Sequence, residues 1–123
     1  EHAFCWIMQE LSKSHASMPS IDELTLTLRE LAPGIAKHGT FNFLLSNGKA
    51  LWAHASTHLY YLERRHPFAQ AQLCDEDLKV NFASETTPDD KVAIVVTAPL
   101  TTNEAWTPFQ SGELRVFVNG EAR

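Results

Sequence analysis

Apolar positions in the first part of the chain recur with helical spacing. They lie three or four residues apart, at Phe4, Ile7, Met8 and Leu11. Polar side chains occupy the intervening positions, so the pattern predicts an amphipathic helix over residues 2–14. Cys5 and Trp6 widen the apolar stripe, which predicts a helix that packs on two sides.

A second helix is predicted after a loop at residues 15–19. Ser20 and Glu23 have the spacing of a capping box, in which each side chain accepts a backbone N–H of the other residue. The expected buried face is formed by Ile21, Leu24, Leu28, Leu31 and Ile35. Pro33-Gly34 is expected to kink or break this helix near its end, and Gly39 is a natural stop.

From Thr40 onward the period changes to that of strands. Asn47-Gly48, between apolar stretches at residues 41–45 and 50–53, predicts a β-hairpin because both residues tolerate a positive φ. Further strands are predicted around residues 59–62, 78–82, 92–96 and 113–118. The unbroken apolar run 92–96 is typical of a strand covered on both faces. Two helices followed by five or six strands make the fold α+β.

Composition narrows the class of protein. The chain has 123 residues, 44% hydrophobic and 20% charged, with a formal net charge of −5. That length suits one domain or a piece of one, and that charge gives no reason to bind nucleic acid or anionic lipid. No apolar run is long enough to span a bilayer. Two cysteines outside any C-x-x-C pattern favour a reducing compartment, and we expect a cytoplasmic protein. Because the chain starts at Glu1 rather than Met, we expect upstream residues to have been removed or omitted.

The individual reactive side chains favour structural roles. His54 and His58 are four apart, a spacing that in a strand separates them by about 13 Å, too far for two ligands of one metal ion. Cys5 lies in an apolar stripe, and Cys74 precedes the acidic residues 75–77, so neither favours a thiolate. We therefore expect no metal site, no cofactor and no nucleophilic cysteine among these residues.

Two polar clusters leave alternatives open. The segment Glu63-Arg64-Arg65-His66 suits either a bound phosphate or carboxylate or, more simply, a solvated strand end. Glu85, Asp89 and Asp90 fit turn and surface charges. The sequence contains no G-x-S-x-G, G-x-G-x-x-G or P-loop motif. No residue can be assigned as catalytic, cofactor-binding or metal-binding from these patterns alone.

Several separated stretches, taken in order, resemble a known family. They are Glu1-His2-Ala3-Phe4-Cys5-Trp6, residues 39–48 (GTFNFLLSNG), residues 86–92 (TTPDDKV), residues 98–106 (APLTTNEAW) and residues 111–117 (SGELRVF). Together they resemble the later half of class II glutamine amidotransferases, over essentially the whole chain. The nearest subgroup is the stand-alone bacterial one, which consists of the glutaminase domain alone.

The resemblance implies an N-terminal-nucleophile (Ntn) hydrolase fold, a four-layer αββα sandwich. Its chemistry releases ammonia from the glutamine side-chain amide through a cysteine thioester, with the cysteine's own α-amino group as base and an Asn-Gly turn for the oxyanion. A substrate-binding aspartate belongs to a Thr-Asp-Ser-Glu tetrapeptide, whose last residue Glu1 matches. Asn47-Gly48 does not correspond to the catalytic Asn-Gly, so no catalytic residue carries over to this chain.

Two hypotheses follow. In the first, residues 1–123 are the C-terminal part of a single glutamine amidotransferase type-2 domain, a transferase and hydrolase in its chemistry. The partner is then the upstream half of the same domain, and the substrate is glutamine or a related γ-glutamyl amide. In the second, the chain is a non-catalytic half-domain that acts as an interaction module. Both predict that apolar surfaces such as residues 92–96 are covered by a partner or by a homo-oligomer.

Overall fold

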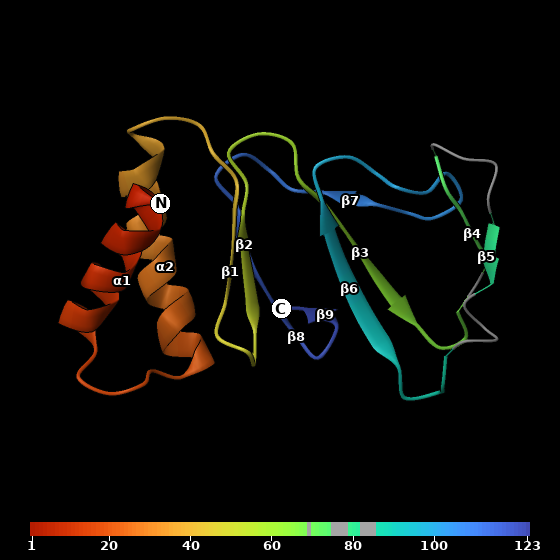
Figure 1. The fold of residues 1–123 in the computed structure, drawn as a ribbon, viewed down its shortest axis with the longest axis horizontal. Helices are drawn as coiled ribbons and strands as arrows, with labels where there is room; N and C mark the ends of the chain where they lie inside the picture. The colour runs from red at the N-terminus through yellow and green to blue at the C-terminus, as the bar shows by residue number, and fades with distance from the viewer. Residues whose placement is uncertain (69, 75–78, 82–85) are drawn as a thin grey trace. The chain divides into compact units, whose positions relative to one another are not determined.

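A computed structural model describes residues 1–68, 70–74, 79–81 and 86–123. The chain divides into two compact units, Glu1–Phe41 and Asn42–Arg123. The first unit is helical and the second is built from strands (Figure 1). The α+β class, with two N-terminal helices followed by antiparallel strands, is confirmed. No helix among the described residues has both the length and the apolar character that a membrane span needs.

The helical unit consists of α1 (His2–Ser14) and α2 (Ile21–Ala36). The predicted capping box starts α2: Ser20 Oγ accepts the N–H of Glu23 at 3.2 Å, and Glu23 Oε2 accepts the N–H of Ser20 at 3.4 Å. Two amides that a helix start leaves without partners are thereby satisfied. The sequence therefore fixes the first turn of α2 locally.

The α2 face that we predicted to be buried is confirmed, whereas the prediction for α1 is partly wrong. On α2, Leu24, Leu28 and Ile35 are buried, and the other two predicted positions are half-buried. On α1 only Ile7 is buried, while Phe4 is 53% exposed and Met8 45%. Cys5, expected in the core, is also exposed. The reason is geometric: one helix pair covers only one sector of α1, and these side chains lie at or beyond its margin.

Proline 33 does not end α2. The helix runs on through Pro33 to Ala36, because a proline at the exposed surface removes one backbone donor without forcing the chain out of the helix. The helix ends at Ala36, its C-cap Lys37 keeps αR backbone angles, and Gly39 then has a φ of 149°, which suits glycine. The helix is therefore not broken at Pro33-Gly34, and it ends before the predicted stop at Gly39.

Within its described residues, the strand unit contains three antiparallel sheets. The four-stranded sheet has the order β1-β2-β8-β9, the three-stranded sheet β6-β3-β7 and the two-stranded sheet β4-β5. The strand bounds are β1 (Phe43–Ser46), β2 (Leu51–His54), β3 (Tyr60–Arg65), β4 (Gln70–Gln72), β5 (Lys79–Asn81), β6 (Lys91–Val96), β7 (Thr107–Pro108), β8 (Leu114–Val118) and β9 (Glu121–Ala122). The predicted strand at residues 78–82 is confirmed at β5, and its end residues lie outside the described part of the chain.

The β1–β2 hairpin is the predicted one. Its turn is held by the Asn47 side chain, whose Oδ1 accepts the N–H groups of Lys49 and Ala50, both at 2.9 Å. Gly48 has a φ of 86°, the left-handed region that glycine adopts without strain. The turn thus needs a positive φ at Gly48 and uses Asn47 for its side-chain acceptor.

Strand β6 differs from its prediction. We expected residues 92–96 to be covered on both faces, yet Val92 is 42% exposed and the next four residues are only half-buried. Among the described strands, β6 pairs with β3 alone and is the edge of its sheet. The apolar run predicted the strand correctly, but it could not show whether the cover is supplied by this chain.

An aromatic cluster forms part of the core of the strand unit. Tyr61 from β3 contacts Phe109 and Phe117 edge-on, each at a ring-centroid distance of 5.5 Å. Ala53, Ala55 and Leu59 are buried in the same cluster, and Ala93 and Val95 of β6 pack against it. Edge-to-face aromatic pairs contribute beyond their buried area. This cluster packs β6 and β3 against β8.

Candidate functional site

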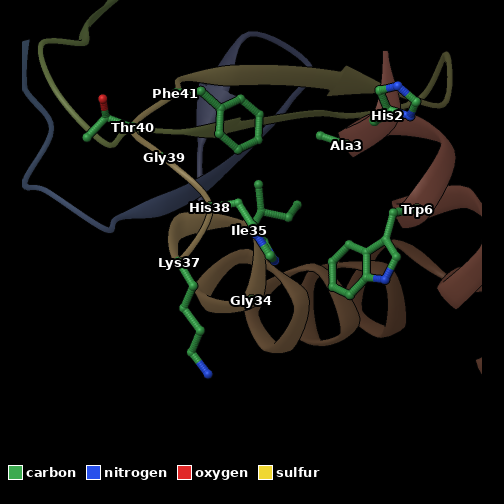
Figure 2. A pocket seen from close by; sticks show the side chains of 10 residues that line it. All are labelled: His2, Ala3, Trp6, Gly34, Ile35, Lys37, His38, Gly39, Thr40 and Phe41. Carbon is green, nitrogen blue, oxygen red and sulfur yellow. The ribbon is translucent and has the colours of Figure 1, made fainter.

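A pocket of about 730 Å³ lies within the helical unit (Figure 2). Its walls come from the first two turns of α1, the last turn of α2 and the segment that follows α2. The lining residues are His2, Ala3, Trp6, Gly34, Ile35, Lys37, His38, Gly39, Thr40 and Phe41. All of them lie within residues 1–41, so one compact unit builds the whole pocket.

The pocket is walled mainly by apolar groups. Trp6, Ile35 and Phe41 point toward the same space, whereas the Lys37 side chain extends away from it (Figure 2). Gly34 makes room for the indole, because a Cβ at this position would lie only 3.2 Å from Trp6 Cη2. The absence of a side chain at Gly34 therefore lets the indole lie against α2.

Chemically, this pocket suits an apolar group with a polar end. His2 and His38 bring imidazoles to its lining, and no carboxylate lines it. Sequence reasoning missed it as a site. The available signal was Trp6, which lies on the opposite margin of the α1 stripe from Phe4 and Met8. Gly34 near the end of α2 was read as a helix breaker rather than as a space for that ring.

A second site, which is polar, lies in the strand unit and joins β3 to the segment before β7. Arg64 Nε donates to Glu104 Oε2 at 2.7 Å, and an Arg64 terminal nitrogen donates to Glu104 Oε1 at 2.6 Å. Thr101 Oγ1 donates to the same carboxylate at 2.8 Å, and Trp106 Nε1 donates to Thr101 Oγ1 at 3.0 Å. This bidentate, charge-assisted geometry is the strong form of an ion pair.

This hydrogen-bond network gives its four residues a structural role. The Arg64 hydrogen bond holds the pKa of the Glu104 carboxyl below its usual range; burial opposes this, and the Thr101 hydrogen bond adds to it. Thr101, Glu104 and Trp106 belong to one of the stretches that carried the family resemblance. In this chain they anchor a loop to a strand.

The basic segment at residues 63–66 is therefore not an open anion site. Arg64 is paired with Glu104, and Arg65 is 2.8 Å from Glu63 and 3.8 Å from Glu121. Arg65 and His66 are exposed, which agrees with the simpler of the two alternatives, a solvated strand end. The Glu104 carboxylate that Arg64 binds belongs to its own chain.

The candidate nucleophiles and metal ligands lie apart. Cys5 and Cys74 are free and exposed, and Cys74 Sγ lies 3.4 Å from the carbonyl of Pro99. Within the described residues no histidine is hydrogen-bonded to either thiol. His54 is buried and stacks on Phe43 with ring centroids 5.1 Å apart. Burial lowers the pKa of His54. The residues whose placement is described contain no group of three or more histidine, cysteine or acidic side chains that could hold a metal ion.

Asn47 and Gly48 are committed to their hairpin. The Asn47 oxygen accepts two backbone amides of the turn, and the Gly48 N–H donates to Ser46 Oγ at 3.1 Å. An oxyanion hole needs donors directed at an external oxygen. This turn uses the Gly48 donor internally, in agreement with the interpretation of a plain hairpin.

Comparison with known proteins assigns the chain to a family. A family model described as "Glutamine amidotransferases class-II" matches residues 1–123. The chain belongs to this family, as the ordered stretches in the sequence indicated.

Individual relatives agree with this assignment. The chain is 41% identical over 121 residues to a Haemophilus influenzae protein named "Putative glutamine amidotransferase". It is 39% identical over 122 residues to the Escherichia coli protein "Putative glutamine amidotransferase YafJ". The crystal structure of a "predicted glutamine amidotransferase" from Pseudomonas aeruginosa superposes with a TM-score of 0.84 at 38% identity. Each comparison covers 98% of this chain but only 41%, 48% and 48% of the other, respectively, so the chain spans about half the length of these relatives.

Proposed function

We propose that residues 1–123 are the C-terminal part of a single class II glutamine amidotransferase domain, and that the catalytic half lies upstream of Glu1. The observation that carries this proposal is a pair of facts about length. The family matches the entire chain, yet the chain accounts for less than half of the relatives that it matches. The proposed parent protein is an enzyme that hydrolyses the side-chain amide of glutamine or of a related γ-glutamyl compound.

The chemistry that this proposal assigns to the upstream half is nucleophilic catalysis by an N-terminal cysteine. The cysteine's α-amino group takes the thiol proton, the sulfur bonds to the amide carbon, and the C–N bond breaks as that proton passes to the nitrogen, which leaves as ammonia. Water then cleaves the thioester and gives the free γ-carboxylate. A cytoplasmic location suits this step, because a reducing compartment keeps the thiol free.

The role proposed for this chain is to back and border the substrate site. Glu1 matches the last residue of the tetrapeptide that carries the substrate-binding aspartate in the family. The pocket in Figure 2 begins at the next residue, His2, and includes Trp6 one turn later. We therefore place the apolar wall formed by Trp6, Ile35 and Phe41 beside the glutamine-binding site.

The test uses protein produced with its upstream half. Incubation with a glutamine-analogue electrophile should modify a single cysteine, located at the mature N-terminus, and the protein should release ammonia from glutamine. Cys5→Ser and Cys74→Ser are matched controls, because both thiols are exposed and neither is hydrogen-bonded to a histidine among the described residues. Both variants should retain full labelling and ammonia release.

The alternative of a non-catalytic interaction module predicts the opposite result. A protein without an N-terminal cysteine, with no labelling and no ammonia release, would contradict the enzyme proposal and leave the module. Loss of labelling in Cys5→Ser or Cys74→Ser would also contradict it, because the reactive sulfur would then lie in this chain.

A further inference from the structure

Strand β6 lies at the edge of its sheet. The backbone N–H and C=O groups on its outer side are paired by no described strand. Strand β6 has six residues and is the longest edge strand among the described sheets. It pairs with β3 over its full length, from Tyr60↔Val96 to Arg65↔Lys91. Its other side has no strand partner within residues 1–68, 70–74, 79–81 and 86–123.

The pairing of β3 shows which β6 groups point outward. The N–H of Phe109 donates to the carbonyl of Leu59 at 2.8 Å, so Leu59 directs its backbone toward the β7 side. Successive residues of a strand direct their N–H and C=O groups to opposite sides. Tyr60 and Leu62 therefore direct theirs toward β6, where they face Val96 and Ile94.

By the same alternation, Ala93 and Val95 direct their N–H and C=O groups to the free edge. Lys91 directs its backbone N–H and C=O groups to the same side. A Cβ added to Gly120 would lie 2.5 Å from the Lys91 carbonyl oxygen, so Gly120 lies close to this end of the edge. The turn before β9 thus covers the Lys91 end of the edge. A hollow of about 360 Å³ lies between residues 91–93 and residues 46, 48–51, 117 and 120 of the same unit.

Beyond Lys91, which is charged and lies against the turn before β9, this edge lacks the features that normally protect an exposed one. Edge strands are usually short, bulged, or interrupted by charge or proline. Residues 92–96 are Val-Ala-Ile-Val-Val, with no charge, no proline and a continuous ladder to β3. A strand of this composition is suited to a paired position inside a sheet.

We propose that the Ala93–Val95 edge of β6 accepts a β-strand from the upstream half of the same polypeptide. This inference rests on the proposed function for the existence of that half. Relatives that match 98% of this chain contain as much polypeptide again or more, and that additional polypeptide is long enough to supply the strand. The added strand would satisfy four outward backbone groups and would cover the exposed side chain of Val92.

Amide hydrogen exchange at single-residue resolution tests the pairing in protein that contains its upstream half. The amides of Ala93 and Val95 should exchange as slowly as those of Ile94 and Val96, on the order of 10³-fold slower than in an unstructured peptide. The amides of Ile94 and Val96 are internal controls, since β3 already pairs with them. Fast exchange at Ala93 and Val95 beside slow exchange at Ile94 and Val96 would overturn the proposal.

Dilution and a matched pair of variants complete the test. If protection at Ala93 and Val95 disappears when a dimer dissociates, a second copy is the occupant and the proposal is wrong.

Val95→Pro removes one outward N–H, whereas Val95→Ala removes more of the side chain but keeps that donor. The proline variant should raise Ala93 exchange at least about 10-fold over the alanine variant; equal rates would count against the pairing. If the proline variant fails to fold, the exchange pattern of the unsubstituted protein still decides the question. Ammonia release is measured separately, so failure of the enzyme proposal and failure of the strand pairing are distinguishable.

Discussion

Truncation of Glu104 should expose how strongly the β3 strand is tied to the segment before β7. Glu104→Ala removes the acceptor of two Arg64 hydrogen bonds and one Thr101 hydrogen bond, at 2.6 to 2.8 Å. Breaking a fully buried ion pair costs about 3–5 kcal/mol, because the remaining charge loses its partner. Here each side chain of the pair is 15% exposed, so water can partly solvate the orphaned guanidinium. We therefore expect a loss of about 2–3 kcal/mol in the free energy of unfolding.

Urea denaturation followed by circular dichroism measures this loss. Glu104→Gln is the matched control, because it keeps the volume and one acceptor but removes the charge; we expect a loss of about 1–2 kcal/mol. A double-mutant cycle with Arg64→Met should give a coupling energy above about 1 kcal/mol.

Because the folded-state pKa of Glu104 is lowered, the contribution of Glu104 to the free energy of unfolding is complete above the pKa of an unfolded glutamate and is lost as the pH falls below about 4.3. A cost below about 0.5 kcal/mol for Glu104→Ala, with no coupling, would refute the reasoning.

Three further substitutions test other parts of the structure. Gly120→Ala should destabilise the protein by about 2 kcal/mol more than Gly112→Ala. Both positions have a positive φ, 74° and 85°, but only at Gly120 does an added Cβ meet a backbone oxygen, at 2.5 Å; equal thermal shifts would contradict this. Burial lowers the pKa of His54, so stability should fall as the pH drops below about 6.5, the pKa of an unfolded histidine. His54→Phe should flatten the stability profile between pH 7 and 5, and an unchanged slope would assign it to another group. Ser20→Ala should cost about 1 kcal/mol by removing the α2 cap, whereas Ser17→Ala, at an exposed loop position, should be neutral in the same urea titration.

Local patterns in the sequence predicted the elements that depend on near neighbours. The Ser20–Glu23 cap, the Asn47-Gly48 turn and both helices follow from contacts within a few residues, and the structure confirms them. Strands β4, β7 and β9 have two or three residues each, which is too short to show a period of two. Their existence depends on partners far away in the chain.

Long-range pairing explains what the sequence could not provide for the candidate sites. Arg64 lies in the basic segment that was considered for anion binding, and Glu104 lies in the family-like stretch 98–106, but 40 residues separate them and no local signal indicates that they pair. The exposure of Phe4, Met8 and Val92 could not be predicted either. An apolar pattern records that a side chain is suited to burial, and it does not identify the polypeptide that buries it.

Pro33 has a consequence for the rim of the helical pocket. Lacking an N–H, it leaves one rung missing from the hydrogen-bond ladder of α2, a turn before the helix ends. Gly34 and Ile35, which line the pocket, follow directly after that gap. The final turn of α2 is therefore held by fewer backbone hydrogen bonds than a turn without proline, whereas the start of the helix is capped. We expect the pocket to widen and narrow through fraying of this one turn, without separation of the two helices.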